Sequence, residues 1–270
     1  MKKAILIFST ITLIHNALLA QDTISKSITE VVVSASRAQD SDNIINAHII
    51  SKEEIKHAPA QTIEDLLEYA INVDVRQRGG QGVQADISMR GGTFEQVLVM
   101  LNGIKLNDPQ TGHHTMDLPV SLEQVERIEV ITGGASRIFG NYAYTGAINI
   151  ITKKEMNNSI NISSGENKFK SAGLNYHIAT KSLKHNISIN QKESDGYING
   201  MDYRIQNYYY QAAINIDGVN TLFNAGYTNK EFGAFSFYSP KYPDQFEVTQ
   251  TAFASLQLRK KGKITLDNKM

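Results

Sequence analysis

The 270-residue chain contains no Cys, which excludes disulfide bonds and metal sites built on thiolates. Its 27 Lys and Arg residues balance its 27 Asp and Glu residues, and no stripe of clustered basic side chains points to nucleic acid. The balance conceals a change along the chain: residues 21–150 hold 10 cationic against 17 acidic side chains, and residues 151–270 hold 15 against 10. Two different bodies are therefore expected, meeting near residue 150.

Residues 1–20 have the pattern of a secretory signal peptide. Lys2 and Lys3 precede a nearly continuous apolar run at 4–14, which is shorter than the ~20 residues of a transmembrane helix. Cleavage is expected after Ala20, and an uncleaved membrane anchor is the alternative. No later segment has a run of apolar residues long enough for a helix to span a membrane, so any crossing would be made by strands.

A leader is expected over residues 21–40. Its one run of β-prone side chains reads ITEVVVS at 28–34, between polar flanks. An extended segment of this kind can add as an edge strand to the sheet of a partner protein, through main-chain hydrogen bonds. An ordinary strand of the following domain is the alternative.

Residues 41–155 predict a compact domain that mixes helices and strands. Thr62 begins a helix as its N-cap, with Asp65 three positions later. Apolar residues follow at the i, i+3, i+4 and i+7 spacing of one helical face: Ile63, Leu66, Leu67 and Ala70. The Asn-Gly pair at 102–103 indicates a tight hairpin. Strands are expected at 73–76, 86–90, 97–101, 104–106, 128–132 and 147–152.

From about residue 156 the helical periodicity disappears, and segments of alternating apolar and polar residues follow. They lie at 159–165, 171–180, 184–191, 207–216, 220–228, 249–259 and 263–269. In the fourth, one face carries Tyr208, Tyr210, Ala212, Ile214 and Ile216, and the other carries Tyr209, Gln211, Ala213 and Asn215. This alternation is typical of a transmembrane barrel strand.

The connections between these segments support the same interpretation. Short ones at 182–183, 217–219 and 260–262 separate long ones at 192–206 and 229–248. Turns and loops differ in this way at the two ends of a membrane barrel. A soluble sandwich is the alternative.

Five motifs, in this order and spacing, carry a resemblance to a known family. They read TEVVVSASR at 29–37, DISMRGG at 86–92, VLVMLNGIKLND at 97–108, VERIEVITGGASRIFG at 125–140 and GAINIITK at 146–153. The chain resembles the N-terminal part of TonB-dependent outer-membrane receptors, particularly those for cobalamin and siderophores. The resemblance implies an α+β plug domain at 41–155, followed at 156–270 by an incomplete antiparallel transmembrane β-barrel. Since plugged barrels have ~22 strands, we expect the chain to be truncated.

The resemblance also implies a function, which is energised uptake of a scarce nutrient through the cell outer membrane. Cobalamin or a ferric siderophore is the leading ligand, and haem or another metal complex is the alternative. The implied partners are the energy-coupling protein TonB, the outer-membrane lipid and the small-molecule ligand, with no nucleic acid. TonB would bind the box at 28–34, formed by Ile28, Thr29, Glu30, Val31, Val32, Val33 and Ser34.

Other classes stay open at this point. A non-energised porin or adhesin barrel would lack the box and the plug, and a periplasmic signalling module built on a plug-like fold would end near residue 155. The sequence carries no enzyme motif, and no cofactor is expected apart from calcium.

In the family, plug arginines pair with barrel glutamates and latch the plug in place. Arg90 matches one such position. Thr132 stands where the second Arg is expected, and Arg137, one turn further on, is the candidate replacement.

Ligand contacts are expected in two plug loops, at 76–85 and 106–117. Their candidate side chains are Arg76, Asn107, Gln110, Thr111, His113 and His114. The His pair has the donors to ligate haem iron or a metal ion, but neighbouring side chains on an extended chain point opposite ways. Hydrogen-bonded loop histidines are therefore the simpler prediction. In the loop at 192–206, oxygen ligands for calcium are offered by Glu193, Asp195 and Asp202, with ordinary solvated acids as the alternative.

Overall fold

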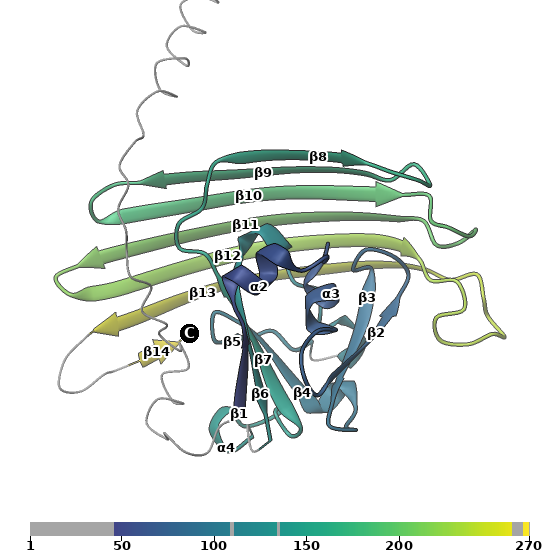
Figure 1. Cartoon of the computed structure of the whole chain (residues 1–270), viewed down its shortest axis with the longest axis horizontal. Helices are drawn as coiled ribbons and strands as arrows, with labels where there is room; N and C mark the ends of the chain where they lie inside the picture. Colours follow the sequence, from purple (N-terminus) through teal and green to yellow (C-terminus); the bar gives the residue numbers. More distant parts are fainter. Residues whose placement is uncertain (1–45, 109–110, 134–135, 261–266, 270) are drawn as a thin grey trace, which may run out of the picture. The chain divides into compact units, whose positions relative to one another are not determined.

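The structure, a computed structural model, describes residues 46–108, 111–133, 136–260 and 267–269. Its strands form three sheets (Figure 1): a five-stranded sheet in the order β1-β6-β7-β4-β5, the β2-β3 hairpin, and a seven-stranded sheet that runs from β8 to β14 in chain order. The predicted signal peptide, leader and TonB box at 28–34 lie outside the described residues.

The plug part, up to residue 152, contains short helices and strands. Its helices are α2 (Lys52–His57), α3 (Ile63–Leu67) and α4 (Ser136–Phe139), with 3-10 turns η1 (Phe94–Gln96), η2 (Gly112–His114) and η3 (Leu122–Gln124). Its strands are β1 (Asn46–Ile50), β2 (Val73–Arg78), β3 (Gln84–Met89), β4 (Val97–Leu101), β5 (Ile104–Lys105), β6 (Val125–Thr132) and β7 (Gly146–Thr152). Within the described ranges, no helix has both the length and the apolar character to span a bilayer.

The second part consists of strands. They are β8 (Ser159–Ser164), β9 (Lys170–Ala179), β10 (Leu183–Ser194), β11 (Tyr203–Ile216), β12 (Val219–Gly233), β13 (Phe246–Lys260) and β14 (Asp267–Lys269). Each pairs antiparallel with its chain neighbour. The expected architecture, an α+β domain followed by an unclosed antiparallel sheet, is confirmed.

The five-stranded sheet forms the core of the plug part. Every residue of β4 (VLVML) and β7 (GAINIIT) is buried. The two strands pair in parallel, whereas the other pairs of this sheet are antiparallel. Apolar runs without alternation are typical of strands that are covered on both faces. Here Leu66 and Leu67 of α3 pack in the cluster on one face, and Phe139 and Ala143 pack in the cluster on the other.

α3 begins where the sequence predicts. Thr62 Oγ1 accepts a hydrogen bond from the Asp65 N–H, and the Asp65 carboxylate accepts from the N–H groups of Gln61 and Thr62 at 2.9 and 3.0 Å. Gln77 Nε2, in β2, donates to the same carboxylate at 2.9 Å. Burial opposes ionisation of Asp65, but these hydrogen bonds outweigh it and hold the pKa of this carboxyl below its ordinary value.

Four strands of the second part are longer than the alternation predicts: β10, β11, β12 and β13. The loops predicted at 192–206 and 229–248 were wrong at their ends, because Lys192 pairs with Ile205 and Lys230 with Thr249 across the ladders. Backbone pairing continues beyond the apolar alternation, into segments that mix polar residues such as Lys192 with buried apolar ones such as Ile205 and Phe232. The connections that remain lie at 195–202 and 234–245.

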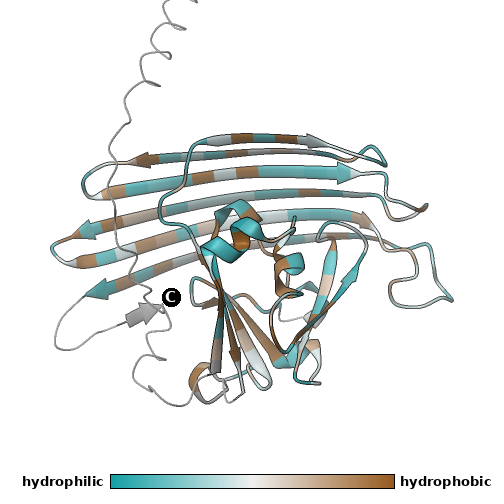
Figure 2. Cartoon of the chain, viewed as in Figure 1, coloured by the Kyte–Doolittle hydropathy of each residue, from teal (hydrophilic) through white to brown (hydrophobic). Residues whose placement is uncertain are grey.

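β11 shows which way these strands face. Tyr209 and Gln211 are buried, whereas Tyr208 is 42% and Ile216 61% exposed. Neighbouring strands also carry exposed apolar side chains: Ile160, Ile162, Leu174, Tyr176, Ile178, Ile187, Ile189, Leu256 and Leu258. Figure 2 shows brown and teal bands alternating along the strands. The predicted alternation is confirmed, and the buried face is the one that contacts the plug.

A cluster of polar side chains attaches the β4–β5 hairpin of the plug to strands β11–β13. Tyr209 Oη donates to Asn224 Oδ1 at 2.9 Å and lies 3.2 Å from Thr152 Oγ1. Asn102 Nδ2 donates to Tyr209 Oη at 3.2 Å, and Gln257 Nε2 donates to the Asn102 carbonyl at 2.8 Å. The predicted Asn-Gly turn is therefore also an attachment point between the plug and the strands.

Candidate functional site

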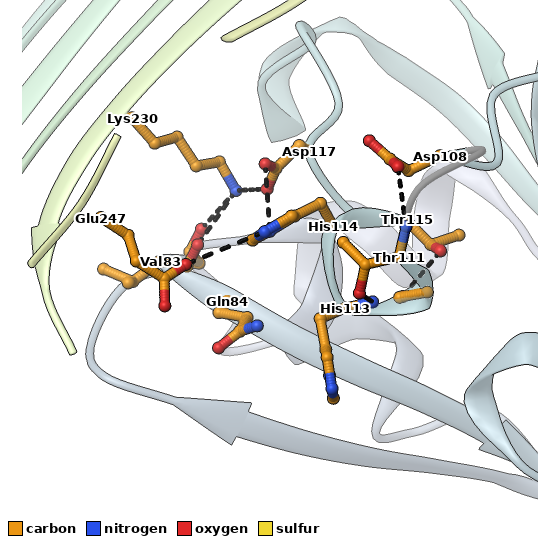
Figure 3. A network of polar contacts seen from close by, with 12 residues as sticks. Val83, Gln84, Asp108, Thr111, His113, His114, Thr115, Asp117, Lys230 and Glu247 are labelled. Atoms are coloured by element: carbon orange, nitrogen blue, oxygen red, sulfur yellow. Dashed lines mark hydrogen bonds and ion pairs between the residues drawn. The ribbon is translucent and has the colours of Figure 1, made fainter. Parts of the chain in front are cut away.

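A polar junction joins the plug to the strands (Figure 3). It contains the loop at 79–83 between β2 and β3, the segment at 111–117, and residues at the facing ends of β12 and β13. We call this set the plug–strand junction. Both plug loops in which the sequence predicts ligand contacts take part in it.

Lys230, in β12, is the central residue of the junction. Its side chain is 4% exposed, and its Nζ lies 2.7 Å from a carboxylate oxygen of Asp117, which is equally buried. The same Nζ donates to the carbonyl oxygens of Gly82 at 2.9 Å and Val83 at 3.2 Å. Since an ammonium has three donors, these contacts neutralise the buried charge and satisfy its hydrogen bonds, which a charge inside a protein requires.

His114 extends the network from the plug to β13. Its Nδ1 lies 3.7 Å from Asp117 Oδ2, and its Nε2 lies 3.8 Å from Glu247 Oε2. These are ion-pair distances, longer than those of hydrogen bonds. One imidazole thus stands between a plug carboxylate and a strand carboxylate, as Figure 3 shows.

His113 faces a different acid. Its Nδ1 lies 2.7 Å from Asp86 Oδ1, and the other oxygen of Asp86 pairs with Arg78 Nη2 at 3.0 Å. Its ring lies 4.4 Å from that of Phe94 and 5.5 Å from that of Tyr238, measured between centroids. The two histidines therefore have separate carboxylate partners. In the part of the chain that the structure describes, no three His, Cys, Asp or Glu side chains gather as a metal site.

Tyr238 brings the β12–β13 loop onto the β2–β3 hairpin. Its hydroxyl accepts from Gln84 Nε2 at 2.9 Å, and the Arg78 guanidinium lies 5.5 Å from the centre of its ring. Burial, together with the neighbouring Glu247 carboxylate, raises the pKa of Tyr238 to about 12. The loop is therefore held by a phenol that stays neutral at physiological pH.

A cavity of about 370 Å³ shares residues with the segment at 111–117. It is lined by Glu95, Asn107, Asp108, Thr111, Gly112, Thr115, Asn141, Tyr142 and Tyr144. Two predicted ligand contacts meet there, but Asn107 is bound to β4: its Nδ2 donates to the Val97 carbonyl at 3.1 Å and its Oδ1 accepts from the Val99 N–H at 3.2 Å. Thr111 accepts from the His113 N–H at 3.3 Å, which closes the turn.

The remaining predicted ligand and latch residues are dispersed. Arg76 is exposed in β2, opposite Asp86 in the ladder, and Gln110 lies outside the described residues. Arg90 is exposed with φ 52°, and its Nη1 lies 3.2 Å from where a Cβ on Gly133 would be. The side chain of Arg137 is outside the described set.

The three acids proposed for calcium do not form one ligand group. Glu193 pairs with Arg204 at 3.3 Å, and Asp195 pairs with Lys168 at 2.6 Å. Asp202 contributes its carbonyl, which accepts from the Gly233 N–H at 2.8 Å. Two of the carboxylates are thus committed to cations, and the arrangement does not support the predicted site.

Lys230, Asp117 and Glu247 were missed as site residues by the sequence analysis. Lys230 lay in a loop according to the sequence prediction, so the sequence assigned its side chain to neither face of the sheet. The signal was nevertheless present, because Lys230 continues the alternate positions of Asn224 and Thr228, which face the plug. A cation on the buried face of a strand requires an acidic partner.

Comparison with known proteins adds a sequence match over the plug. Residues 38–147 match the family model of the TonB-dependent Receptor Plug Domain. The chain is 35% identical over 124 residues to the vitamin B12 transporter BtuB of Vibrio vulnificus, a match that covers 45% of this chain and 20% of that protein. The corresponding transporter of Vibrio cholerae is 34% identical over 125 residues, with coverage of 46% and 20%. The matches thus span a fifth of the length of these relatives.

Solved structures resemble a larger share of the chain. The siderophore receptor PirA from Acinetobacter baumannii gives a TM-score of 0.65 at 16% identity, covering 87% of this chain and 40% of that one. The ferric yersiniabactin uptake receptor FyuA from Yersinia pestis gives 0.64 at 15% identity, covering 82% and 39%. At these identities the likeness shows the fold alone, which is a plug domain followed by antiparallel strands.

Proposed function

Because this chain carries the plug domain of the TonB-dependent receptors, a family of outer-membrane proteins, we propose that it serves the energised uptake of a scarce nutrient through the outer membrane. The observation that carries the proposal is a plug bound by buried polar contacts to strands whose other face is apolar and exposed. A plug attached to lipid-facing strands supports gated import better than an open pore. The ligand is moved and not chemically converted.

Cobalamin is the ligand we propose first, because the relatives that match in sequence are named vitamin B12 transporters. A ferric siderophore is the second candidate, since the similar folds are named siderophore and ferric yersiniabactin receptors. Haem ranks below both, because His113 and His114 each stand beside a carboxylate. The ligand-facing surface we propose is formed by the loops at 76–85 and 106–117.

TonB is proposed to bind the box at 28–34 by strand addition, which suits its β-branched residues. The described plug begins at β1, with Asn46. Residues 35–45 therefore connect the box to the plug sheet, and fully extended they reach at most about 40 Å. A pull on the box would be transmitted to β1 along this connection. We place the leader at 21–40, the plug at 41–155 and the barrel strands from 156, with Arg90 as a latch.

Equilibrium binding identifies the ligand. Radiolabelled cobalamin would be titrated into outer-membrane vesicles that contain the receptor carrying this chain, with and without calcium, beside a panel of ferric siderophores and haem. Saturable cobalamin binding is the expected result. Binding of one siderophore without cobalamin would select the second candidate, and no binding of any probe would contradict the proposal.

Energised uptake tests the TonB proposal. Val32→Pro removes a main-chain donor in the middle of the box, so accumulation of the ligand in cells should fall to the level of a strain without TonB while surface binding is kept. Ser25→Pro, outside the box, is the matched control and should leave uptake unchanged. Normal uptake by Val32→Pro would rule out residues 28–34 as the contact.

A further inference from the structure

Two lysines from the strands donate to three consecutive carbonyl groups of the plug loop at 79–83. Lys192, in β10, donates to the carbonyl oxygen of Gln81. Lys230, in β12, donates to those of Gly82 and Val83 at 2.9 and 3.2 Å. The two strands lie on either side of β11, so the ammonium groups reach the loop from two positions on the same sheet.

The loop has a conformation that depends on outside support. Gln81 and Gly82 have φ values of 55° and 76°, in the left-handed region, which is unfavourable for a residue with a Cβ such as Gln81. A Cβ on Gly82 would lie 3.1 Å from a carboxylate oxygen of Glu64, a tight contact that adds to the preference of this φ for glycine. The Val83 N–H donates to the Gly80 carbonyl at 3.1 Å and closes the turn. The carbonyls of residues 81–83 are then satisfied by the two lysines.

Lys230 is placed for more than an ion pair. Asp117, at 2.7 Å, occupies one of its three donors, and the two loop carbonyls occupy the others. One strand residue therefore holds both the loop at 79–83 and the segment at 111–117. These are parts of the two plug loops that we propose to contact the ligand.

The loop has space into which it can move. Gly80, Gln81 and Gly82 line a cavity of about 670 Å³, together with both lysines. Val83 is buried beside the cavity, in an apolar cluster with Tyr203 and Phe232. The hydrogen bonds from the two ammonium groups thus hold a loop that borders open space.

We propose that Lys192 and Lys230 form a lysine clamp, a pair of positioning residues that hold the loop at 79–83 in the shape that the ligand meets. The clamp acts through the loop carbonyls and touches no ligand. Its effect on the loop stands on the geometry alone, and its effect on ligand binding rests on the proposed function.

Hydrogen–deuterium exchange of the intact receptor, without ligand, tests the clamp on the loop. In Lys192→Met and in Lys230→Met, the amides of 79–83, above all the Val83 N–H that donates to the Gly80 carbonyl, should exchange about tenfold faster or more, because a turn that loses the lysine bonds to its carbonyl groups opens more often. Lys241→Met, which changes an exposed lysine of the β12–β13 loop, should leave these amides unchanged. Unaltered exchange of 79–83 in Lys192→Met would overturn the proposal.

A double variant separates the clamp from a plain ion pair. Lys230→Met alone leaves the buried Asp117 carboxylate without its close cation, with His114 Nδ1 still 3.7 Å away, which disturbs the junction by itself. Lys230→Met combined with Asp117→Asn removes both charges and still deprives the two carbonyls of their donor. If the clamp is correct, the loop amides exchange fast in the double variant. A return to the exchange rate of the parent receptor would show that Lys230 acts only as the ion-pair partner of Asp117. Should these variants fail to assemble, Lys192→Met decides the matter when it is compared with Lys192→Arg, which keeps the positive charge near the buried Glu64 carboxylate.

Ligand affinity is the second readout, with cyanocobalamin and ferric siderophores as probes. Lys192→Met should raise the Kd about tenfold, because a loop that is not pre-organised must be ordered on binding. The uptake rate at saturating ligand should be kept, and Lys192→Arg, which retains donors and charge, should recover part of the affinity. An unchanged Kd in Lys192→Met would overturn this part. If the parent receptor binds no probe, the proposed function fails, while the exchange result still judges the clamp.

Discussion

Tyr209 shows at the residue scale how one side chain joins two parts of the molecule. Its ring is buried in the apolar core of the plug, although the residue belongs to β11. Its hydroxyl contacts three polar side chains, on the plug and on β12: Asn102, Thr152 and Asn224. An apolar ring with a polar tip suits a place where a core meets a polar wall.

Removal of this hydroxyl should weaken the attachment of the plug. Tyr209→Phe is expected to lower the free energy of unfolding by about 1–2 kcal/mol, because buried amide groups lose a partner. Denaturant unfolding of the receptor measures the change, and exchange of amides 100–104 localises it. Tyr208→Phe, whose side chain lies on the exposed face, is the control, and an equal loss there would contradict the assignment.

Asp65 makes the plug sensitive to acid. A carboxyl whose pKa is lowered by folding stabilises the fold above its ordinary value of 3.8, and this stabilisation disappears as the pH falls through the lowered value. Asp65→Ala should therefore cost about 1 kcal/mol at neutral pH and less under acid conditions. Exchange of amides 62–68, corrected for its intrinsic pH dependence, measures this difference. A cost that does not vary with pH would show that the ionised form is not what stabilises α3.

At the scale of elements, the local sequence pattern predicted a helix start or a turn correctly where a single local interaction determines the structure. The cap formed by Thr62 and Asp65, and the hairpin at 102–103, are confirmed. The helical face was extended to Ala70, whereas α3 ends at Leu67. Ala70 is nevertheless buried, because i to i+3 hydrogen bonds from Tyr69 and Ala70 keep the chain turning beyond the helix.

Contacts between distant elements could not be predicted in this way. The alternation of apolar and polar residues predicted which face of each strand is buried, because successive side chains of a strand point to opposite faces of the sheet. It could not pair Lys230 with the carbonyl of Gly82, since 148 residues separate them. The candidate site consists mostly of such contacts, which explains why single residues in its loops were found while the network that holds them was not.

Asn186 is the strand residue that binds the first two carbonyl groups of the linker from β7 to β8. Asn186, 2% exposed in β10, donates from Nδ2 to the carbonyls of Lys153 at 3.1 Å and Lys154 at 3.2 Å. Asn186→Ala should accelerate amide exchange at 153–158 and destabilise the receptor by about 1–3 kcal/mol, since both carbonyls lose their donor. Asn215→Ala, an exposed Asn near the end of β11, is the comparison. Equal effects of the two substitutions would remove the special role of Asn186.

At the scale of the whole molecule, the seven-stranded sheet has two environments. One face packs on the plug through polar side chains and a few apolar ones, and the other presents apolar side chains that nothing in the described residues covers. A contiguous apolar face of this kind indicates a lipid or protein neighbour. The proposed function makes lipid the expected one.

Adjacent residues of β10 test this division. Ile189 is 42% exposed, whereas Asn190 lines the cavity of about 670 Å³ on the plug side. Ile189→Lys should cost about 2–4 kcal/mol if the residue lies near the bilayer midplane, and the yield of folded receptor in outer-membrane fractions should fall. Asn190→Lys should be tolerated. Loss of assembly in the second variant alone would reverse the assignment of the faces.

β1 lies at the edge of the plug sheet and pairs with β6 alone among the described strands. Tension applied to the chain before Asn46 would enter this ladder at the Asn46–Thr132 pair. A force directed away from the sheet would separate the β1–β6 residue pairs one after another, up to Ile50–Ile128. Breaking these hydrogen-bonded pairs one at a time requires less force than shearing them all together. The sheet would then yield at this strand while β4 and β7, buried on both faces, stay paired, so that a small mechanical load opens one side of the plug without unfolding the rest.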